Sequence, residues 1–276
     1  MRIAIYQANT GIDPDANARD LIAAVEQAAE GGAAILFTPE MSGLLDRDRE
    51  RAQRHIRDEA SDPVLAAVRQ AAARARVWVH IGSLALASGA GDGRLVNRGF
   101  LIDDGGAIRA RYDKMHLFDV DLPTGESWRE SASYAGGERP VVADTPLGRL
   151  GLSICYDLRF PDLYRALTGA GATILAIPAA FTVPTGEAHW HVLLRARAIE
   201  AGVFVVAAAQ VGRHADGRET YGHSLVVDPW GRVLLDMGTE PGLGLADIDL
   251  AQVDEVRSRL PAIRHRRAIT QPQVME

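Results

Sequence analysis

The chain contains one cysteine and one lysine, and both side-chain types can take part in covalent catalysis. Cys155 is the only thiol among 276 residues, and Lys114 is the only lysine in a chain with 30 Lys and Arg residues. A thiolate is a strong nucleophile, and a compact ammonium can stabilise negative charge where a planar guanidinium does not fit. A strong bias toward arginine would leave about one lysine by chance, so the position of Lys114 has to indicate its role.

Cys155 and a glutamate, Glu40, each follow a segment that predicts a buried strand, residues 150–154 and 34–38 respectively. A side chain at the carboxyl end of a strand projects into the crevice above the sheet, where the next backbone N–H groups can stabilise an oxyanion. Each residue also has an ordinary alternative. A lone cysteine can be a small core residue, and a glutamate can be a surface or helix-terminal carboxylate.

Short β-branched runs alternate with longer segments of helical periodicity, and the same order occurs in both halves of the chain. We predict strands at residues 2–7, 34–38, 77–84, 150–154, 173–177 and 203–209, and helices at 17–30, 61–76, 160–168 and 189–201. Turn residues at 103–106 and 228–231 predict one hairpin in each half. The pattern indicates one α/β domain, residues 1–276, with an internal pseudo-twofold repeat and no linker between the halves.

The overall composition excludes several classes of protein. A formal net charge of −6 and an isoelectric point near 5.8 give no general attraction to nucleic acid or anionic lipid. No apolar run approaches the ~20 residues that a membrane helix needs. The N-terminal segment, residues 1–7, becomes polar too soon for a signal peptide. We therefore expect a cytoplasmic protein that binds neither nucleic acid nor membranes.

Metal sites and disulfides are not expected either. One cysteine excludes an intrachain disulfide and a multi-cysteine zinc or iron–sulfur site. His189 and His191 occupy alternate positions of a predicted helix, where their side chains would point in different directions. With no cluster of further ligands in the sequence around them, we expect no metal.

Three segments occur in an order that identifies a family. They are Thr-Pro-Glu-Met at 38–41, Tyr-Asp-Lys-Met-His-Leu at 112–117, and Ile-Cys-Tyr-Asp-Leu-Arg-Phe-Pro at 154–161. Together they resemble the nitrilase, or carbon–nitrogen hydrolase, superfamily, and the resemblance covers almost the whole chain. Flanking segments, among them residues 181–190 and 221–224, look most like the branch of deaminated glutathione amidases, next to the ω-amidases.

The resemblance implies a fold and a catalytic set. The fold is a four-layer αββα sandwich, which in this superfamily often assembles into homodimers or higher homo-oligomers. The catalytic residues are Glu40, Lys114 and Cys155, with Glu130 as a second glutamate. The backbone N–H of Tyr156 is expected to hold the oxyanion together with Lys114. No cofactor and no metal are implied.

The implied reaction is hydrolysis of a small linear carboxamide to its acid and ammonia through a cysteine thioester. Deaminated glutathione is the first substrate implied, and α-ketoglutaramate or another small amide is the alternative. Glu40 would act as the base, and burial could raise its pKa toward the working range. We expect Phe181, Thr185 and His189 to contact the substrate.

Other interpretations stay open at this point. Glu130 could be a surface carboxylate, because Glu126 and Glu138 lie in the same loop. Cys155 could instead pair with a histidine, for which the candidates are His116, His189 and His223. Arg159 could bind a substrate carboxylate, although a structural ion pair is the commoner role, and Arg195 and Arg197 are expected to be structural. A non-catalytic binding protein on the same fold is the alternative from a different class.

Overall fold

Two six-stranded sheets form the centre of the molecule. The computed structural model describes residues 1–89, 91, 93–121, 125 and 127–275. The first sheet has the order β16-β1-β2-β3-β4-β5, with strands β1 (Arg2–Gln7), β2 (Ile35–Phe37), β3 (Trp78–Ala87), β4 (Leu95–Ile102), β5 (Ile108–Asp113) and β16 (Gly242–Asp247). The second has the order β15-β14-β11-β10-β9-β8, with strands β8 (Val141–Thr145), β9 (Gly148–Leu152), β10 (Ile174–Ala176), β11 (Phe204–Ala207), β14 (Leu225–Val227) and β15 (Val233–Asp236).

The two sheets repeat the same pairing pattern. In each, three adjacent strands are parallel, β1-β2-β3 in the first and β9-β10-β11 in the second. Antiparallel strands flank both parallel trios, with β16 and β4 beside the first and β8 and β14 beside the second. Both predicted hairpins are present, between β4 and β5 and between β14 and β15. The internal pseudo-twofold repeat is therefore confirmed.

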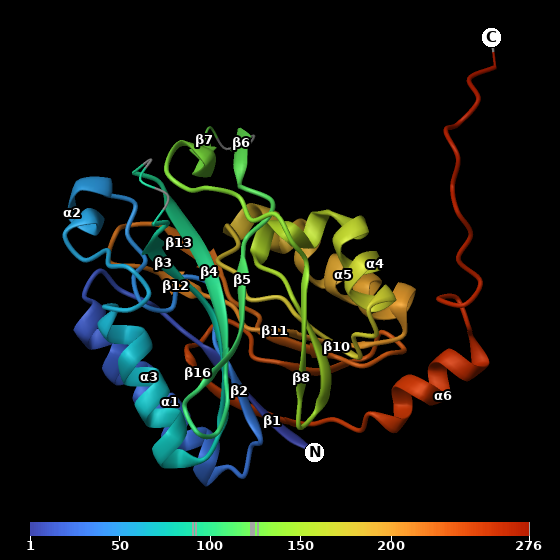
Figure 1. Cartoon of the computed structure of the whole chain (residues 1–276), viewed down its shortest axis with the longest axis horizontal. Helices are drawn as coiled ribbons and strands as arrows, with labels where there is room; N and C mark the ends of the chain where they lie inside the picture. Colours follow the sequence, from blue (N-terminus) through green and yellow to red (C-terminus); the bar gives the residue numbers. More distant parts are fainter. Residues whose placement is uncertain (90, 92, 122–124, 126, 276) are drawn as a thin grey trace.

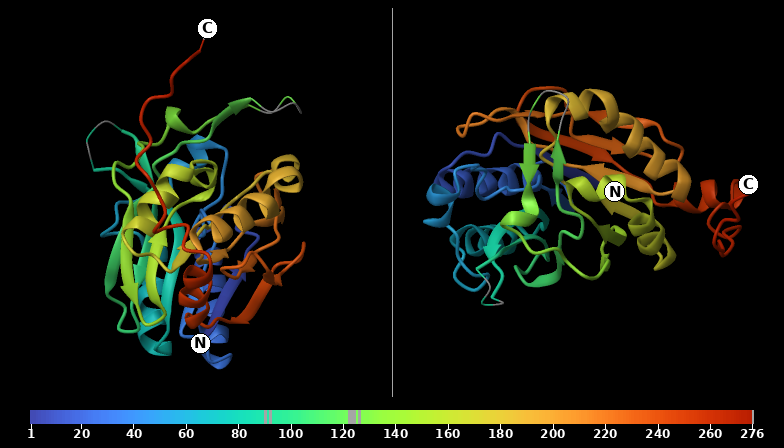
Figure 2. Two further views of the ribbon diagram at one scale, coloured as in Figure 1. Left: turned by 90° about the vertical axis from the view of Figure 1, so that its right-hand side faces the viewer. Right: turned by 90° about the horizontal axis from the view of Figure 1, so that it is seen from above.

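Helices cover the outer faces of the sheets, which makes four layers in the order α, β, β, α (Figures 1 and 2). The helices are α1 (Pro14–Glu30), α2 (Arg49–Gln53), α3 (Pro63–Ala75), α4 (Pro161–Gly169), α5 (Val183–Ala201) and α6 (Ala251–Arg259). α1 and α3 pack on the first sheet, and α4 and α5 pack on the second. The chain after α6 extends away from the layers (Figure 1). The expected sandwich is thus confirmed.

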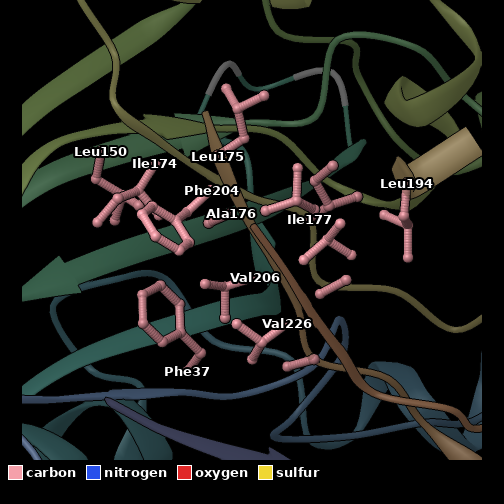
Figure 3. Close-up of a cluster of buried hydrophobic side chains, with 14 of the residues drawn as sticks. Phe37, Leu150, Ile174, Leu175, Ala176, Ile177, Leu194, Phe204, Val206 and Val226 are labelled. Atoms are coloured by element: carbon pink, nitrogen blue, oxygen red, sulfur yellow. The ribbon is translucent and has the colours of Figure 1, made fainter. Parts of the chain in front are cut away.

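The alternation of side chains along β1 shows how one sheet faces two cores. Ile3 and Ile5 join the core between the two sheets, whereas Ala4 joins the core beneath α1 and α3. Successive side chains of a strand point to opposite faces, so a sheet covered on both sides buries all of them. Phe37 of β2 likewise shares the inter-sheet cluster with Val206 of β11 (Figure 3).

Two helices begin earlier than their periodicity predicts. α1 begins at Pro14, because the Asp13 side chain caps it by accepting from the Asp15 N–H. α5 begins at Val183 instead of residue 189. A proline lies in its first turn, where a backbone N–H would have no partner within the helix, so the proline does not prevent the helix from beginning there. Gly202 ends α5 in the left-handed conformation, as expected.

Four small elements complete the chain. They are the short hairpins of β6 (Asp119–Asp121) with β7 (Ser127–Arg129) and of β12 (Val211–Arg213) with β13 (Glu219–Tyr221), and the 3-10 helices η1 (Glu130–Ala132) and η2 (Cys155–Arg159). Among the described residues, none of the helices is long and apolar enough to cross a membrane.

His80, on β3, generates a prediction about stability in acid. It is buried, its Nδ1 has no hydrogen-bond partner among the described residues, and burial lowers its pKa to about 3. The unfolded chain binds this proton below about pH 6.5 and the folded chain does not, so stability falls as pH drops from 6.5 toward 3. Between pH 6.5 and 4.5 the loss due to His80 is roughly 2–3 kcal/mol.

The variant His80→Leu removes the titrating group. Its free energy of unfolding in urea should fall less between pH 6.5 and 4.5 than that of the wild type. The exposed His55 provides the control, because His55→Leu leaves the pH dependence of the wild type intact. Equal slopes for His80→Leu and the wild type would contradict the buried, neutral state of His80.

Candidate active site

Cys155 lies at the first position of η2, directly beyond the carboxyl end of β9. Its φ of 51° places its backbone in the left-handed region, which residues other than glycine rarely adopt. The Cys155 N–H donates to the Pro178 carbonyl at 2.8 Å, which holds this turn against the segment after β10. Strained backbone of this kind concentrates at functional sites because the surroundings must enforce it.

Asp157 connects the cysteine turn to the segment that carries Lys114. This buried carboxylate accepts from the Ile154 N–H at 2.8 Å and from the Tyr112 hydroxyl at 2.7 Å. It also contacts the N–H of His116 at 3.0 Å and its Nδ1 at 2.6 Å. Because Tyr112 and His116 lie on either side of Lys114 in the chain, these bonds fix the lysine segment relative to the cysteine.

Lys114 lies between two carboxylates. Its Nζ donates to Oε1 of Glu40 at 3.0 Å and to Oε2 and Oε1 of Glu130 at 2.8 and 3.1 Å. The Lys114 side chain is 2% exposed, and those of Glu40 and Glu130 are 6% and 12% exposed. All three charges are therefore largely removed from water. In the protein interior, ionic attraction is stronger than in water and an unpaired charge is most unfavourable.

Glu40 also contacts the second half of the molecule. Its Oε2 accepts from the Ala180 N–H at 3.0 Å, and its carboxylate interacts electrostatically with the Cys155 thiol. Ala180 follows β10, the strand that occupies the same place in the second sheet as β2 does in the first. The two halves of the repeat thus bring Glu40, Lys114, Cys155 and Glu130 together.

Asn97 is a member of this cluster that the sequence analysis did not identify. It is buried on β4, and its Nδ2 donates to Oε1 of Glu40 at 2.9 Å and to Oε1 of Glu130 at 3.2 Å. The backbone carbonyl of Asn97 accepts from the backbone N–H of Lys114 at 3.0 Å. The available signal was a polar residue beside Arg98 in a mostly apolar strand, which alone does not indicate a partner.

Burial and the neighbouring charges together determine the protonation states of Lys114, Glu40 and Cys155. Burial alone would lower the pKa of Lys114, but the carboxylates of Glu130 and Glu40 raise it well above its ordinary value. Burial would likewise raise the pKa of Glu40, but the Lys114 charge and its hydrogen bonds lower it. Burial, and then the negative charge of Glu40, raise the pKa of the Cys155 thiol well above its ordinary value.

At neutral pH this cluster therefore contains an ammonium, an ionised Glu40 and a protonated thiol. Burial acts on Glu40 in the expected direction, but the expected net rise of its pKa was wrong, because the Lys114 charge and the hydrogen bonds that the fold supplies outweigh burial. The thiol must lose its proton as it attacks, and the Glu40 carboxylate is already in contact to accept it.

A cavity of about 740 Å³ opens above the cluster. Glu40, Lys114, Glu130, Cys155 and Tyr156 all line it. The N–H of Tyr156 lies in the first turn of η2, where N–H groups have no partner within the helix. It is therefore suited to stabilise an oxyanion.

Two of the three expected substrate contacts line the cavity. Phe181 and Thr185 do, whereas His189 is exposed and is not among the lining residues. His189 lies one helical turn beyond Thr185 and contacts the Arg159 guanidinium through Nδ1 at 3.3 Å. The substrate contacts of Phe181, Thr185 and His189 stay predictions, and the position of His189 supports its contact least.

Arg159 lines the cavity, and its guanidinium contacts Nδ1 of His189 but no carboxylate of the described residues. Its guanidinium lies 6.0 Å from the ring centroid of Tyr156 and 5.5 Å from that of Phe181. The structural ion pair that we considered the commoner role is therefore not formed with any described carboxylate. Arg195 and Arg197 do have structural roles, because they donate to the carbonyls of Gly231 and Leu158.

The competing interpretations of Cys155 and Glu130 lose support. His116 binds Asp157, His189 contacts Arg159, and His223 contacts Asp236, so each histidine proposed for a Cys–His pair has another partner. Glu138 is exposed and does not line the cavity. Glu126 lies outside the described residues.

Comparison with known proteins gives one family and several close relatives. The carbon-nitrogen hydrolase family matches residues 2–258 of the chain. A deaminated glutathione amidase from Yersinia enterocolitica is 41% identical over 261 residues, which cover 92% of this chain and 90% of that protein. The deaminated glutathione amidase of Homo sapiens is 41% identical over 270 residues, which cover 96% of this chain and 82% of that protein.

Solved structures agree with the architecture. The crystal structure of the C. elegans NitFhit protein has a TM-score of 0.89 and 38% identity to this chain. The match covers 96% of this chain and 65% of that one, so the chain corresponds to only part of NitFhit. A mutant amidase from Nesterenkonia sp. AN1, which shows the result of acrylamide addition at its active-site cysteine, has a TM-score of 0.78 and 28% identity, with 95% of this chain and 98% of that chain covered.

The contact between Glu40 and Cys155 predicts how the thiol titrates. Glu40→Gln removes a negative charge and leaves the Lys114 ammonium in place, so the pKa of Cys155 should fall. The rate of alkylation by iodoacetamide, measured from pH 6 to 10, should then rise at lower pH than in the wild type. The control Glu138→Gln changes an exposed glutamate and should leave the profile unchanged. A profile that stays in place or moves to higher pH in Glu40→Gln would contradict the assigned charge state.

Proposed function

The chain belongs to the carbon–nitrogen hydrolase family, and from this premise we propose that it hydrolyses the amide bond of deaminated glutathione. The family and the amidases among its relatives make the chain an amidase, as the sequence motifs predict, and the non-catalytic alternative is set aside. The observation that carries the proposal is the contact of Glu40 with both Cys155 and Lys114 at the base of one cavity.

The first step that we propose forms a thioester. Glu40 takes the thiol proton as Sγ of Cys155 attacks the amide carbonyl, and the carbonyl oxygen becomes an oxyanion. The Lys114 ammonium and the Tyr156 N–H stabilise it. Protonated Glu40 then gives its proton to the leaving nitrogen as the C–N bond breaks. Because an amide anion is a very poor leaving group, this protonation is as important as the attack.

The second step hydrolyses the thioester. Glu40 takes a proton from water, the hydroxide attacks the thioester carbonyl, and the same oxyanion contacts are used again. Collapse releases the carboxylic acid and the Cys155 sulfur, which regains the proton from Glu40, and the acid then loses its proton to solvent. The role proposed for Glu130 is to hold the Lys114 ammonium in place, since it accepts two of the hydrogen bonds from Nζ.

The leaving group depends on the amide. Deaminated glutathione is a substituted amide, so its hydrolysis releases the amine of a cysteinyl dipeptide and an α-keto dicarboxylate. Ammonia, the product expected from the motifs alone, leaves only when the substrate is a primary carboxamide such as α-ketoglutaramate. The relatives that are deaminated glutathione amidases favour the first substrate, and the second remains the alternative.

The electrostatics of the cavity support an anionic substrate. Arg47, Arg49, Arg94, Arg129, Arg159 and Arg218 all line it. Deaminated glutathione carries a carboxylate at each end of the molecule, and arginine binds carboxylates through paired N–H donors. We assign one of the two carboxylates to Arg159, because it lies beside Tyr156 and Phe181 and no described carboxylate pairs with it.

A product assay on three amides tests this proposal. The purified chain is incubated with deaminated glutathione, α-ketoglutaramate and the neutral amide propionamide, and the released α-keto acid, amine or ammonia is measured. We expect the highest kcat/KM for deaminated glutathione and no turnover by Cys155→Ser. No release from the first two amides would overturn the substrate assignment and leave the family membership intact.

The variant Arg159→Leu separates binding from chemistry in the same assay. Loss of a hydrogen-bonded charge pair of about 1.5–3 kcal/mol should raise KM for deaminated glutathione by ~10–100-fold. Turnover of propionamide, which has no carboxylate, should be unchanged. The control Arg109→Leu changes an exposed arginine outside the cavity. An equal loss on both amides would show that Arg159 does not bind a substrate carboxylate.

Three broader expectations stay predictions. They are a single domain over residues 1–276, a cytoplasmic location and a homodimer or higher homo-oligomer. Val192 and Ile199 of α5 and the nearby Trp230 expose apolar surface that a second copy could cover.

A further inference from the structure

Three side chains from distant parts of the sequence converge outside the cavity. Nε2 of His191 lies 3.0 Å from Oδ2 of Asp236, and Nδ1 of His223 lies 2.9 Å from Oδ1 of the same carboxylate. One nitrogen of each imidazole and one carboxylate oxygen all lie within 4.8 Å of one another. None of the three residues lines the cavity above Cys155.

Each of the three comes from a different structural element. His191 lies on α5, His223 precedes β14, and Asp236 ends β15. Their side chains are 34%, 23% and 34% exposed, so an ion could enter from solvent. The sequence shows no short spacing motif because residues 191, 223 and 236 meet only in the folded chain.

The backbone and rings around the cluster are held in place. His223 has a φ of 53°, and its N–H donates to the Gly238 carbonyl at 2.7 Å. Its carbonyl accepts from Nε1 of the buried Trp190, the residue that precedes His191 on α5, at 2.8 Å. The ring of Tyr221 stacks on His223 with centroids 4.5 Å apart and meets His191 edge-on at 6.1 Å.

Hydrogen bonds hold the Asp236 carboxylate in one orientation. The Gly238 N–H donates to Oδ1 at 2.9 Å, which is the kind of outer hydrogen bond that fixes a metal-binding carboxylate.

We propose that His191, His223 and Asp236 bind one divalent transition-metal ion of the zinc class. Two imidazole nitrogens and a carboxylate are a ligand set that Zn²⁺ takes with a fourth position open to water. Two ligands of a tetrahedral Zn²⁺ at 2.0–2.1 Å lie about 3.3 Å apart. Oδ2 of Asp236 lies 3.0 Å from Nε2 of His191 and 3.2 Å from Nδ1 of His223, so these two separations need only small changes.

The ion would connect α5 to the edge of the second sheet. Tyr221, which packs on both histidines, also lies against Gly186 of α5, where an added Cβ would come within 2.2 Å of its ring. Thr220 and Thr185, next to these two residues in the chain, line the cavity. The site would therefore stabilise the wall of the cavity formed by α5 and β13, without taking part in the chemistry at Cys155.

Calorimetric titration of the full chain with ZnCl₂, after EDTA treatment and desalting, tests the proposal. We expect one ion per chain in the wild type and a ~100-fold weaker affinity in His191→Ala and in Asp236→Asn, since loss of even an outer-shell partner weakens metal binding 10–100-fold. At a hundredfold excess of Zn²⁺ over Kd, the unfolding temperature of the wild type should rise by about 5 °C, and that of the two variants should not.

Two controls separate this site from other zinc-binding groups. His55→Ala removes an exposed histidine away from the cluster and should bind Zn²⁺ like the wild type. Cys155→Ser removes the only thiol and should also retain the site. The proposal is overturned if the wild type does not bind Zn²⁺. It is equally overturned if binding survives in His191→Ala and disappears in Cys155→Ser, which would place the ion at the active-site thiol.

Discussion

The buried ammonium of Lys114 is the interaction on which the rest of the site depends. Two carboxylates, Glu40 and Glu130, lie largely out of water, and their mutual repulsion would be severe without a cation between them. Breaking a buried ion pair by removing one partner typically costs about 3–5 kcal/mol, because an uncompensated charge remains. Much of the architecture serves to bring this lysine and its partners together. Asp157 ties the lysine segment to the cysteine turn, and Asn97 donates to both carboxylates.

One ammonium between two carboxylates leaves a net negative charge beside Cys155, and this decides how the reaction begins. The thiol stays protonated, because burial disfavours the thiolate and because Glu40 opposes a second negative charge more strongly than Lys114 favours one. In the proposed attack, the proton moves to Glu40 as negative charge moves through sulfur to the carbonyl oxygen. The net charge of the buried cluster therefore stays constant during the step. Lys114 loses part of its interaction with Glu40 and gains one with the oxyanion.

The residues that directly follow strands or lie in continuous motifs could be predicted from sequence, and those fixed by distant contacts could not. Glu40 and Cys155 were recognised because strand ends and flanking motifs are local features. Asn97 was missed because its partners come from other parts of the chain. The start of α5 was predicted too late, at residue 189 instead of Val183, because a proline lies in its first turn. The cluster of His191, His223 and Asp236 arises only when α5 and β15 pack together. The six strands of the two parallel trios were predicted, since parallel strands buried on both faces are short apolar runs in the sequence.

In the proposed mechanism, Lys114 acts as a compact ammonium that no other cation replaces. The most direct measurement is kcat/KM of Lys114→Arg on deaminated glutathione, in protein whose circular dichroism and unfolding temperature show that it is folded. The guanidinium keeps the charge but cannot place one donor between Glu40, Glu130 and the oxyanion. Loss of an oxyanion contact should lower the rate by ~10²–10³-fold. A folded Lys114→Arg variant with near-wild-type turnover would contradict the account.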